Sequence, residues 1–77
     1  MDIELSDQAK KFKLGTYRHY KGGLYQVLGV ANHSETLEEM VYYKHLDDGS
    51  FWVRPLKMFL EEVEVDGVKK PRFEYLR

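Results

Sequence analysis

The sequence predicts a mainly β fold, namely a small SH3-like antiparallel barrel of five to six short strands with one helical turn and a short N-terminal extension. Short runs rich in β-branched and aromatic residues are separated by glycine-marked turns, as in small all-β domains. No strand alternates with a long helical pattern, which favours antiparallel pairing. The chain has only 77 residues, and closing so few strands into a barrel would remove their exposed edges.

The chain is expected to divide into an N-terminal extension, residues 1–13, and a barrel domain, residues 14–77. Ser6 precedes a run of helix-compatible residues and can cap a short helix over residues 7–12. A helix of one or two turns is marginal by itself. We therefore expect this helix only if Leu5 or Phe12 docks on the barrel, and a disordered extension otherwise.

The first hairpin is predicted from residues 16–20 and 24–31, which are both rich in β-forming residues. Two adjacent glycines in the turn at 21–23 can supply positive φ angles without steric cost. Gly29, near the end of the second strand, indicates a bend or a bulge of the kind that small barrels use at their corners.

The second hairpin is predicted from residues 39–46 and 51–54, joined by a polar turn at 47–50. Leu37, Met40 and Val41 also fit the i, i+3, i+4 spacing of a helix. The dense run of β-forming residues up to Leu46 favours the strand.

Pro55 is expected to end this strand and to begin a single helical turn over residues 55–59. In residues 61–65, Val63 and Val65 alternate with glutamates, which predicts a strand with the valines facing inward and the glutamates facing water. Asp66-Gly67 is typical of a type I′ hairpin turn. The strand that follows, residues 68–76, contains Pro71, which a sheet tolerates only at an edge or a bulge.

Several separate motifs in this order are similar to those of one compact bacterial family. They are the runs 17–25 (YRHYKGGLY), 33–36 (HSET), 52–56 (WVRPL) with Met58 and Phe59, and 71–73 (PRF). The chain resembles the family catalogued as domain of unknown function 1653, from about Gly15 to Leu76. Residues 1–13 fall outside the resemblance, and Lys44 stands where an arginine is expected. The resemblance implies a small bacterial β-barrel, and it implies no activity.

Composition restricts the kind of protein further. There is no cysteine, which excludes disulfides and thiolate zinc sites. The N-terminus lacks the pattern of a signal peptide, and no apolar stretch approaches the roughly 18–20 residues of a membrane span. We expect a soluble, cytoplasmic monomer with no cofactor and no membrane partner. The net charge is −1, but residues 8–34 contain no acidic side chain, which leaves nucleic-acid binding through this basic third as an alternative function.

His33, Ser34 and Glu35 are residue types that hydrolases use, and a small hydrolase or metal site in this loop is a second alternative. A serine nucleophile needs a base within hydrogen-bond reach, yet neighbours in an extended chain point to opposite faces. The chain also has no Gly-x-Ser-x-Gly elbow. The capping patterns of Asn32 with Glu35 and of Thr36 with Glu39 explain the loop as a self-supported polar turn.

Aromatic and basic residues give the preferred functional prediction. Trp52 and Arg54 are two apart on a strand and share a face, where an arginine can stack on an indole or on a ligand. Trp52 could instead be the largest core residue. We expect a non-catalytic binding module for a protein or peptide partner. Its candidate surface comprises Tyr17, His19, Tyr25, His33, Ser34, Glu35, Thr36, Tyr42, Trp52 and Arg54.

Overall fold

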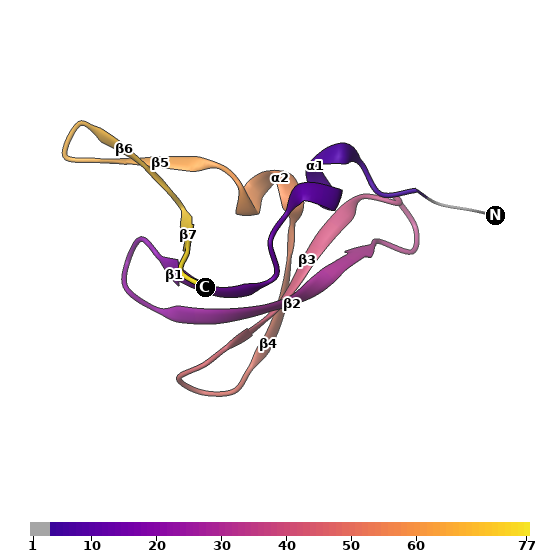
Figure 1. Cartoon of the computed structure of the whole chain (residues 1–77), viewed down its shortest axis with the longest axis horizontal. Coiled ribbons are helices and arrows are strands. Elements are labelled where there is room, and N and C mark those ends of the chain that lie inside the picture. The colour runs from indigo at the N-terminus through magenta and orange to yellow at the C-terminus, as the bar shows by residue number, and fades with distance from the viewer. Residues whose placement is uncertain (1–3) are drawn as a thin grey trace.

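The computed structural model describes residues 4–77, and these residues form a mainly β protein with two antiparallel sheets (Figure 1). The strands are β1 (Gly15–His19), β2 (Leu24–Asn32), β3 (Glu39–His45), β4 (Phe51–Pro55), β5 (Glu62–Val65), β6 (Val68–Pro71) and β7 (Phe73–Tyr75). The helices are α1 (Asp7–Lys11) and α2 (Leu56–Phe59). One sheet has the strand order β4-β3-β2-β1-β7, and β5 pairs with β6 in the other.

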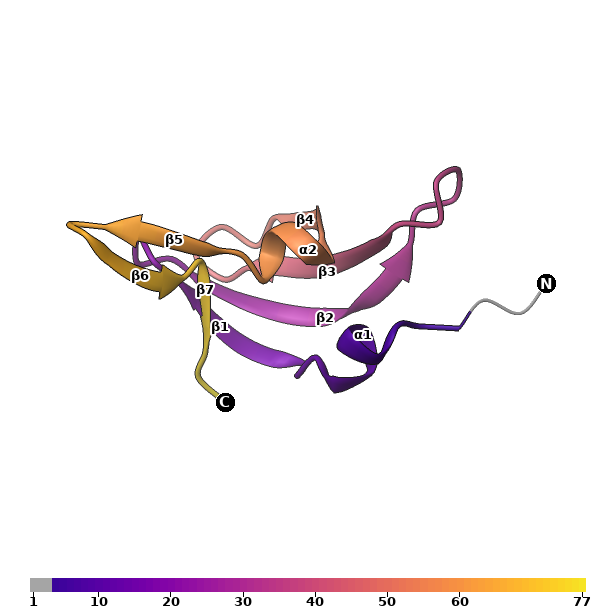
Figure 2. The ribbon, with the colours of Figure 1, turned by 90° about the horizontal axis from the view of Figure 1, so that it is seen from above.

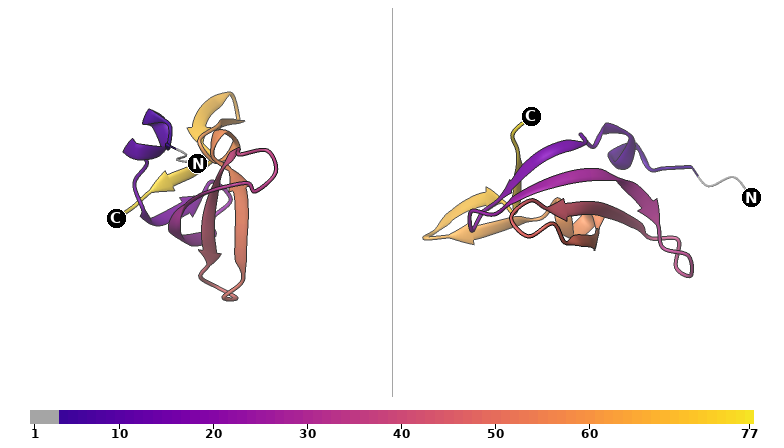
Figure 3. Two further views of the ribbon diagram at one scale, coloured as in Figure 1. Left: turned by 90° about the vertical axis from the view of Figure 1, so that its right-hand side faces the viewer. Right: turned by 90° about the horizontal axis from the view of Figure 1, so that it is seen from below.

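The predicted antiparallel β class is confirmed, but the strands do not close into the SH3-like barrel that we expected. β4 and β7 are the two edges of the five-stranded sheet and lie apart in the end-on view (Figure 3). Closure would need a strand that bridges these edges. Within residues 4–77, β5 and β6 pair only with each other, so the sheet stays open.

The predicted hairpins are confirmed with small changes at their ends. Residues 39–45 are strand β3 rather than helix. Both residues of the Asp66-Gly67 turn have positive φ, 52° and 78°, as a type I′ turn requires. The single strand expected over residues 68–76 is instead two strands. The chain bends at Arg72, directly after Pro71, so that β6 stays with β5 while β7 crosses to pair with β1.

Strand β2 is the centre of the large sheet and carries the predicted bulge. Its pairing with β3 shifts register between Val27 and Gly29. The extra residue lets Val27 and Val30 both point to the buried side, where Val27 is 1% exposed. The bulge thereby helps to curve the sheet around its core.

Helix α1 is formed as expected and docks on the concave face of the curved sheet. The Ser6 hydroxyl accepts a hydrogen bond from the Ala9 N–H at 3.1 Å, and Ala9 is buried. Leu5 and Phe12 pack against the core on either side of the helix. Because this short helix cannot be stable alone, its docking explains why the segment is ordered. The prediction for residues 1–3 lies outside the described part of the chain.

Helix α2 is the predicted helical turn, and it places Phe59 at the centre of the core. The Phe59 ring stacks on Phe73 with centroids 4.1 Å apart and meets Tyr17 edge-on at 5.4 Å. Figure 1 shows α1 and α2 next to each other over the sheet, and the Phe12 and Phe59 rings touch between them at 5.4 Å. The two helices therefore cover one part of the concave face.

The β5–β6 hairpin projects from the body as an arm, at the opposite end from the loop between β2 and β3 (Figure 2). Val63 and Val65 are half-buried on one side of this arm, and Glu62 and Glu64 face water, as their alternation predicts. Within residues 4–77, no helix has the length and apolar character needed to cross a membrane.

Candidate binding pocket

The part of the concave face that the helices leave open is lined by aromatic and basic side chains. Cross-strand partners share a face of a sheet, and the register pairs Tyr43 with Trp52 and Tyr25 with His45. Arg54 follows Trp52 on the same face of β4. These five residues enclose a cavity of about 340 Å³ and together define the pocket.

The aromatic walls of the pocket come from β2 and β3. Tyr25 stacks on His45, with ring centroids 4.7 Å apart, and meets the edge of Tyr43 at 5.4 Å. Burial raises the pKa of the Tyr25 hydroxyl, so it stays a neutral hydrogen-bonding group. The walls offer flat apolar surface with polar edges, which suits recognition of a ligand that is partly apolar.

Arg54 is the positively charged residue of the pocket that has no acidic partner among residues 4–77. Its Nε lies 3.4 Å from the Tyr43 hydroxyl, and its guanidinium lies 5.7 Å from the centre of the Phe73 ring. Among residues 4–77 it forms no ion pair, whereas Arg18 pairs with Glu74 at 2.8 Å and Arg72 with Glu61 at 3.5 Å. The Arg54 guanidinium therefore keeps donors available for an anionic ligand.

His19 borders this positive region from β1. Its ring lies 6.3 Å from that of Tyr25 and 4.9 Å from that of Phe73. Burial lowers the pKa of His19, and the charges of Arg54, Arg72 and Lys21 lower it further. His19 therefore lies in a partly buried place that three basic side chains surround.

Trp52 forms the outer rim of the pocket, and 54% of its surface is exposed. The interpretation of Trp52 as a core residue is therefore wrong. Its indole N–H donates to the Ser50 hydroxyl at 2.6 Å, and that hydroxyl donates to Asp48 at 2.6 Å. The hydrogen bonds from Ser50 lower the pKa of Asp48 to about 2. Hydrogen bonds within the turn thus hold the exposed indole in place.

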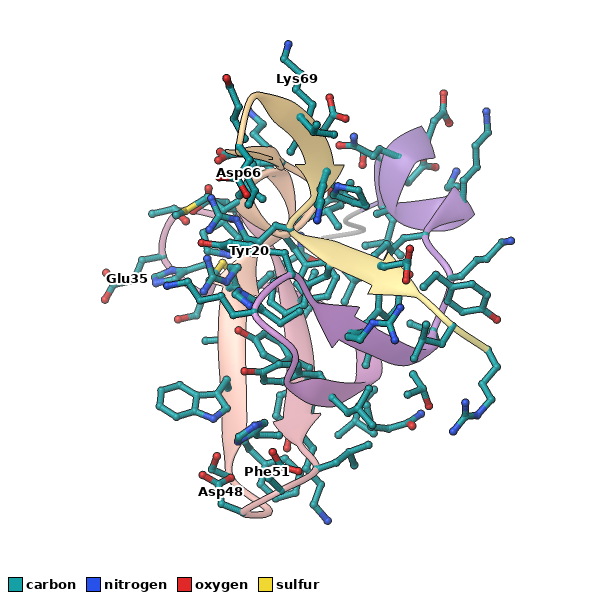
Figure 4. The ribbon with its side chains drawn as sticks, turned by 90° about the vertical axis from the view of Figure 1, so that its left-hand side faces the viewer. Tyr20, Glu35, Asp48, Phe51, Asp66 and Lys69 are labelled. Carbon is teal, nitrogen blue, oxygen red and sulfur yellow. The ribbon has the colours of Figure 1, made fainter. Side chains whose placement is uncertain are left out.

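The structure divides the ten predicted surface residues among four places, namely the pocket region, the core, the convex face and the loop between β2 and β3. Tyr25, Trp52 and Arg54 meet in the pocket, and His19 lies beside it. Tyr17 is a core residue whose hydroxyl donates to the Lys13 carbonyl at 2.6 Å, and burial raises its pKa to about 12. Tyr42 lies on the convex face and stacks on Phe51 at 5.7 Å. Figure 4 shows Phe51 and Asp48 together at the turn between β3 and β4.

The remaining four predicted residues, 33–36, form the exposed loop between β2 and β3. His33 Nδ1 accepts the N–H groups of Glu35 and Thr36 at 3.1 and 3.3 Å. The Thr36 hydroxyl accepts the Glu38 N–H at 3.2 Å. Among the described contacts, no hydrogen bond joins Ser34 to His33. Hydrogen bonds within the loop support its shape, as expected. Of the backbone N–H groups that donate to these loop side chains, two donate to the His33 imidazole and one to the Thr36 hydroxyl.

The two capping boxes predicted for this loop are wrong, because no helix follows either cap. The Asn32 amide instead donates to the Leu37 carbonyl at 3.2 Å. Glu39 accepts hydrogen bonds from the Ser6 N–H and hydroxyl at 2.7 and 2.6 Å. These bonds lower the pKa of Glu39. The carboxylate therefore fastens the start of α1 to β3.

Sequence reasoning left two residues of the pocket, Tyr43 and His45, out of the candidate surface. The period-2 pattern of residues 39–46 indicates that they share a face, but only the register shows that this is the face of Trp52. No cluster of three metal-ligating side chains occurs in the described part of the chain.

Two further cavities lie elsewhere on the surface and are less suited to a ligand. One of about 470 Å³, between α1 and the loop at 36–38, includes Ser6 and Glu39, which already bond to each other. Another of about 350 Å³ lies beside the turn after β1 and includes the paired Arg18 and Glu74. Of these three cavities, only the pocket beside Trp52 contains an arginine without an acidic partner among residues 4–77.

Comparison with known proteins places this geometry in a family. The model of the family described as "Protein of unknown function (DUF1653)" matches residues 15–75. A crystal structure of a DUF1653 protein from Bordetella bronchiseptica is 37% identical, covers 88% of this chain and 91% of its own, and superimposes with a TM-score of 0.83. No curated protein matches the chain. The match over residues 15–75 agrees with the resemblance read from the sequence motifs, and the chain belongs to the DUF1653 family.

Proposed function

We propose that the domain is a non-catalytic binding module that holds a carboxylate of a protein or peptide partner in the pocket. The observation that carries this proposal is the half-buried Arg54 guanidinium, which has no acidic partner among residues 4–77. An arginine binds a carboxylate through two parallel hydrogen bonds, which gives both energy and orientation. The aromatic walls and the exposed Trp52 would cover the apolar part of the same ligand.

The loss of stability that a half-buried, unpaired Arg54 causes supports a role of this residue in binding. A cation removed partly from water without a partner weakens a fold, and a domain of this size has only a few kcal/mol to lose. Arg18 and Arg72, by contrast, both have an acidic partner. A bound carboxylate would supply the missing partner of Arg54.

The charge pattern gives less support to nucleic-acid binding. A nucleic acid needs several neighbouring phosphate contacts along its backbone. The strand residue of the basic third, Arg18, is already engaged by Glu74. Lys10 and Lys11 lie on α1, away from the pocket. One free arginine among aromatic rings fits a single carboxylate better than a chain of phosphates.

The loop of His33, Ser34 and Glu35 gives comparably little support to hydrolysis. The imidazole Nδ1 accepts two backbone N–H groups in its own loop. A general base must instead reach the proton of its nucleophile.

Titration with pools of short peptides tests the proposal. The probes are hexapeptides with blocked ends, one pool rich in glutamate and a matched pool with glutamine instead. We expect the glutamate pool alone to shift the NMR signals of Tyr43 and the Trp52 indole. Arg54→Gln should abolish these shifts, and Arg18→Gln, which alters a paired arginine outside the pocket, should keep them. Equal shifts with both pools, or shifts only with single-stranded nucleic acid, would overturn the proposal.

A further inference from the structure

The outer edge of β4 is free to pair with another strand. The His45 N–H donates to the Ser50 carbonyl at 2.8 Å, and hydrogen-bonded pairs alternate along an antiparallel ladder. With the observed register, the backbone groups of Trp52 and Arg54 therefore face β3. The N–H and C=O groups of Phe51 and Val53 face away from the sheet, where β4 has no neighbour within the described chain.

This edge lacks most of the features that protect exposed strands. Proteins normally place charges, prolines or covering segments on such an edge. Here three consecutive apolar residues are exposed on both faces of the strand, namely Phe51 at 54%, Trp52 at 54% and Val53 at 59%. Pro55 has no N–H to offer and ends the unprotected stretch. A strand added beside β4 would cover all three apolar side chains.

We propose that the partner is an extended acidic peptide that pairs antiparallel with β4 and delivers a carboxylate to Arg54. This inference rests on the proposed function and names the binding mode. Residues placed opposite Trp52 and Arg54 occupy non-hydrogen-bonded positions, where cross-strand side chains approach most closely. The side chains of these two peptide residues would lie on the same face of the sheet as the pocket. The peptide pattern is therefore an acidic residue two positions before an apolar one.

The added strand is a peptide rather than a second copy of β4, on grounds of charge. The segment Phe51–Pro55 contains no acidic residue. Two copies paired through this strand would leave both Arg54 guanidiniums without a partner. An acidic peptide supplies the carboxylate, and its backbone satisfies the outward-facing groups of Phe51 and Val53.

Three short peptides with blocked ends test the pattern. The first is Ser-Thr-Glu-Thr-Val-Thr-Ser, the second exchanges the positions of glutamate and valine, and the third has glutamine for glutamate. We expect the first to bind at least tenfold more tightly than the other two, measured by the fluorescence of the single tryptophan, Trp52. Its binding should also protect the amides of Phe51 and Val53 from hydrogen exchange. Preference for the second peptide, or no added protection, would overturn the antiparallel pairing.

Backbone pairing is separated from the carboxylate contact by a second pair of variants. Val53→Pro removes an outward-facing N–H and should weaken binding of the first peptide at least tenfold. Lys69→Pro places a proline on the separate β5–β6 sheet, labelled in Figure 4, and should bind normally. Unchanged binding in Val53→Pro would overturn strand addition while leaving the proposed function intact. Unchanged binding in Arg54→Gln would overturn the proposed function itself.

If Val53→Pro does not fold, hydrogen exchange on the unaltered protein still tests strand addition, through protection of the Phe51 and Val53 amides by the first peptide. Light scattering of the free protein tests whether a second copy of the chain occupies the edge of β4 instead. A dimer that peptide addition does not dissociate, and that protects the Phe51 and Val53 amides, would show that a second copy occupies the edge and would overturn the peptide proposal.

Discussion

Two parts of the same concave face differ in how much of their large aromatic side chains is exposed to solvent. Where the helices pack on the sheet, Phe59 of α2 is 1% exposed and stacks on Phe73. In the pocket, Trp52 has more than half of its surface in water, although it lies on the same side of the sheet. Both are large aromatic residues of the segment 51–60. Only Phe59 is buried, at the place where α1 and α2 pack on the sheet.

This difference separates residues that stabilise the fold from residues that the proposed function uses for binding. Burial of an aromatic ring is the main stabilising contribution in a domain of this size. A ring left exposed contributes little to folding, so its position has to be explained by something other than packing. Substitutions on the two sides should therefore affect different measurements.

The largest effect is expected at the centre of the covered part. Phe59→Ala should lower the free energy of unfolding by about 3–5 kcal/mol, because it removes a fully buried ring from a cluster with Tyr17, Tyr43 and Phe73. Urea denaturation followed by circular dichroism measures this change. Phe59→Leu keeps most of the volume and should cost less than half as much. A loss below about 1 kcal/mol for alanine would mean that the core does not depend on this ring.

A smaller effect is expected where α1 closes the covered part. Phe12→Ala should lower the free energy of unfolding by about 2 kcal/mol, since the ring is only half-buried between Tyr17 at 5.6 Å and Phe59 at 5.4 Å. Lys10→Ala, on the exposed side of the same helix, is the matched control and should change little. Equal stability of Phe12→Ala and the wild type would show that α1 is not part of the core.

The charge of Arg54 should be detectable at His19 without any ligand. Burial lowers the pKa of His19 first, and Arg54 adds to this effect. Arg54→Gln should therefore raise the His19 pKa toward its usual value, as NMR titration would measure. Arg18→Gln should leave it unchanged, because Arg18 does not contribute to the shift. A His19 pKa that stays the same in Arg54→Gln would show that the two groups do not interact.

The same pKa shift has a consequence for stability. Because the folded pKa of His19 lies below the unfolded value, the unfolded chain binds more protons between the two values. The contribution of His19 to stability is present above pH 6.5, and it is lost as the pH falls through the folded pKa. Arg54→Gln should reduce this loss.

The elements could be predicted from the sequence, but their arrangement could not. The strands, the helical turn and the Gly29 bulge all follow from local patterns. Closure of the barrel was predicted wrongly, since local patterns do not tell which strand β7 pairs with. Pro71 indicated an edge or a bulge in the last strand, but the change of sheet at Arg72 depends on long-range pairing with β1.

The pocket was predictable only in part, for a similar reason. The spacing of Trp52 and Arg54 on one strand placed them on a common face. Tyr17 belongs to the same face but is buried, because α1 and α2 cover its end of the sheet. Tyr42 lies on the convex face because it follows Val41 by one residue. Coverage by helices is a tertiary property that no local pattern contains.

The smallest stability effect is expected at the rim of the pocket. Trp52→Ala should change the free energy of unfolding by no more than about 0.5 kcal/mol, because the indole is largely in water and gives up one hydrogen bond, to Ser50. Urea denaturation followed by circular dichroism measures this without relying on tryptophan fluorescence. The same variant should no longer bind glutamate-rich peptides. A loss of more than about 1.5 kcal/mol would place Trp52 with the core residues and remove the distinction between the two parts of the face.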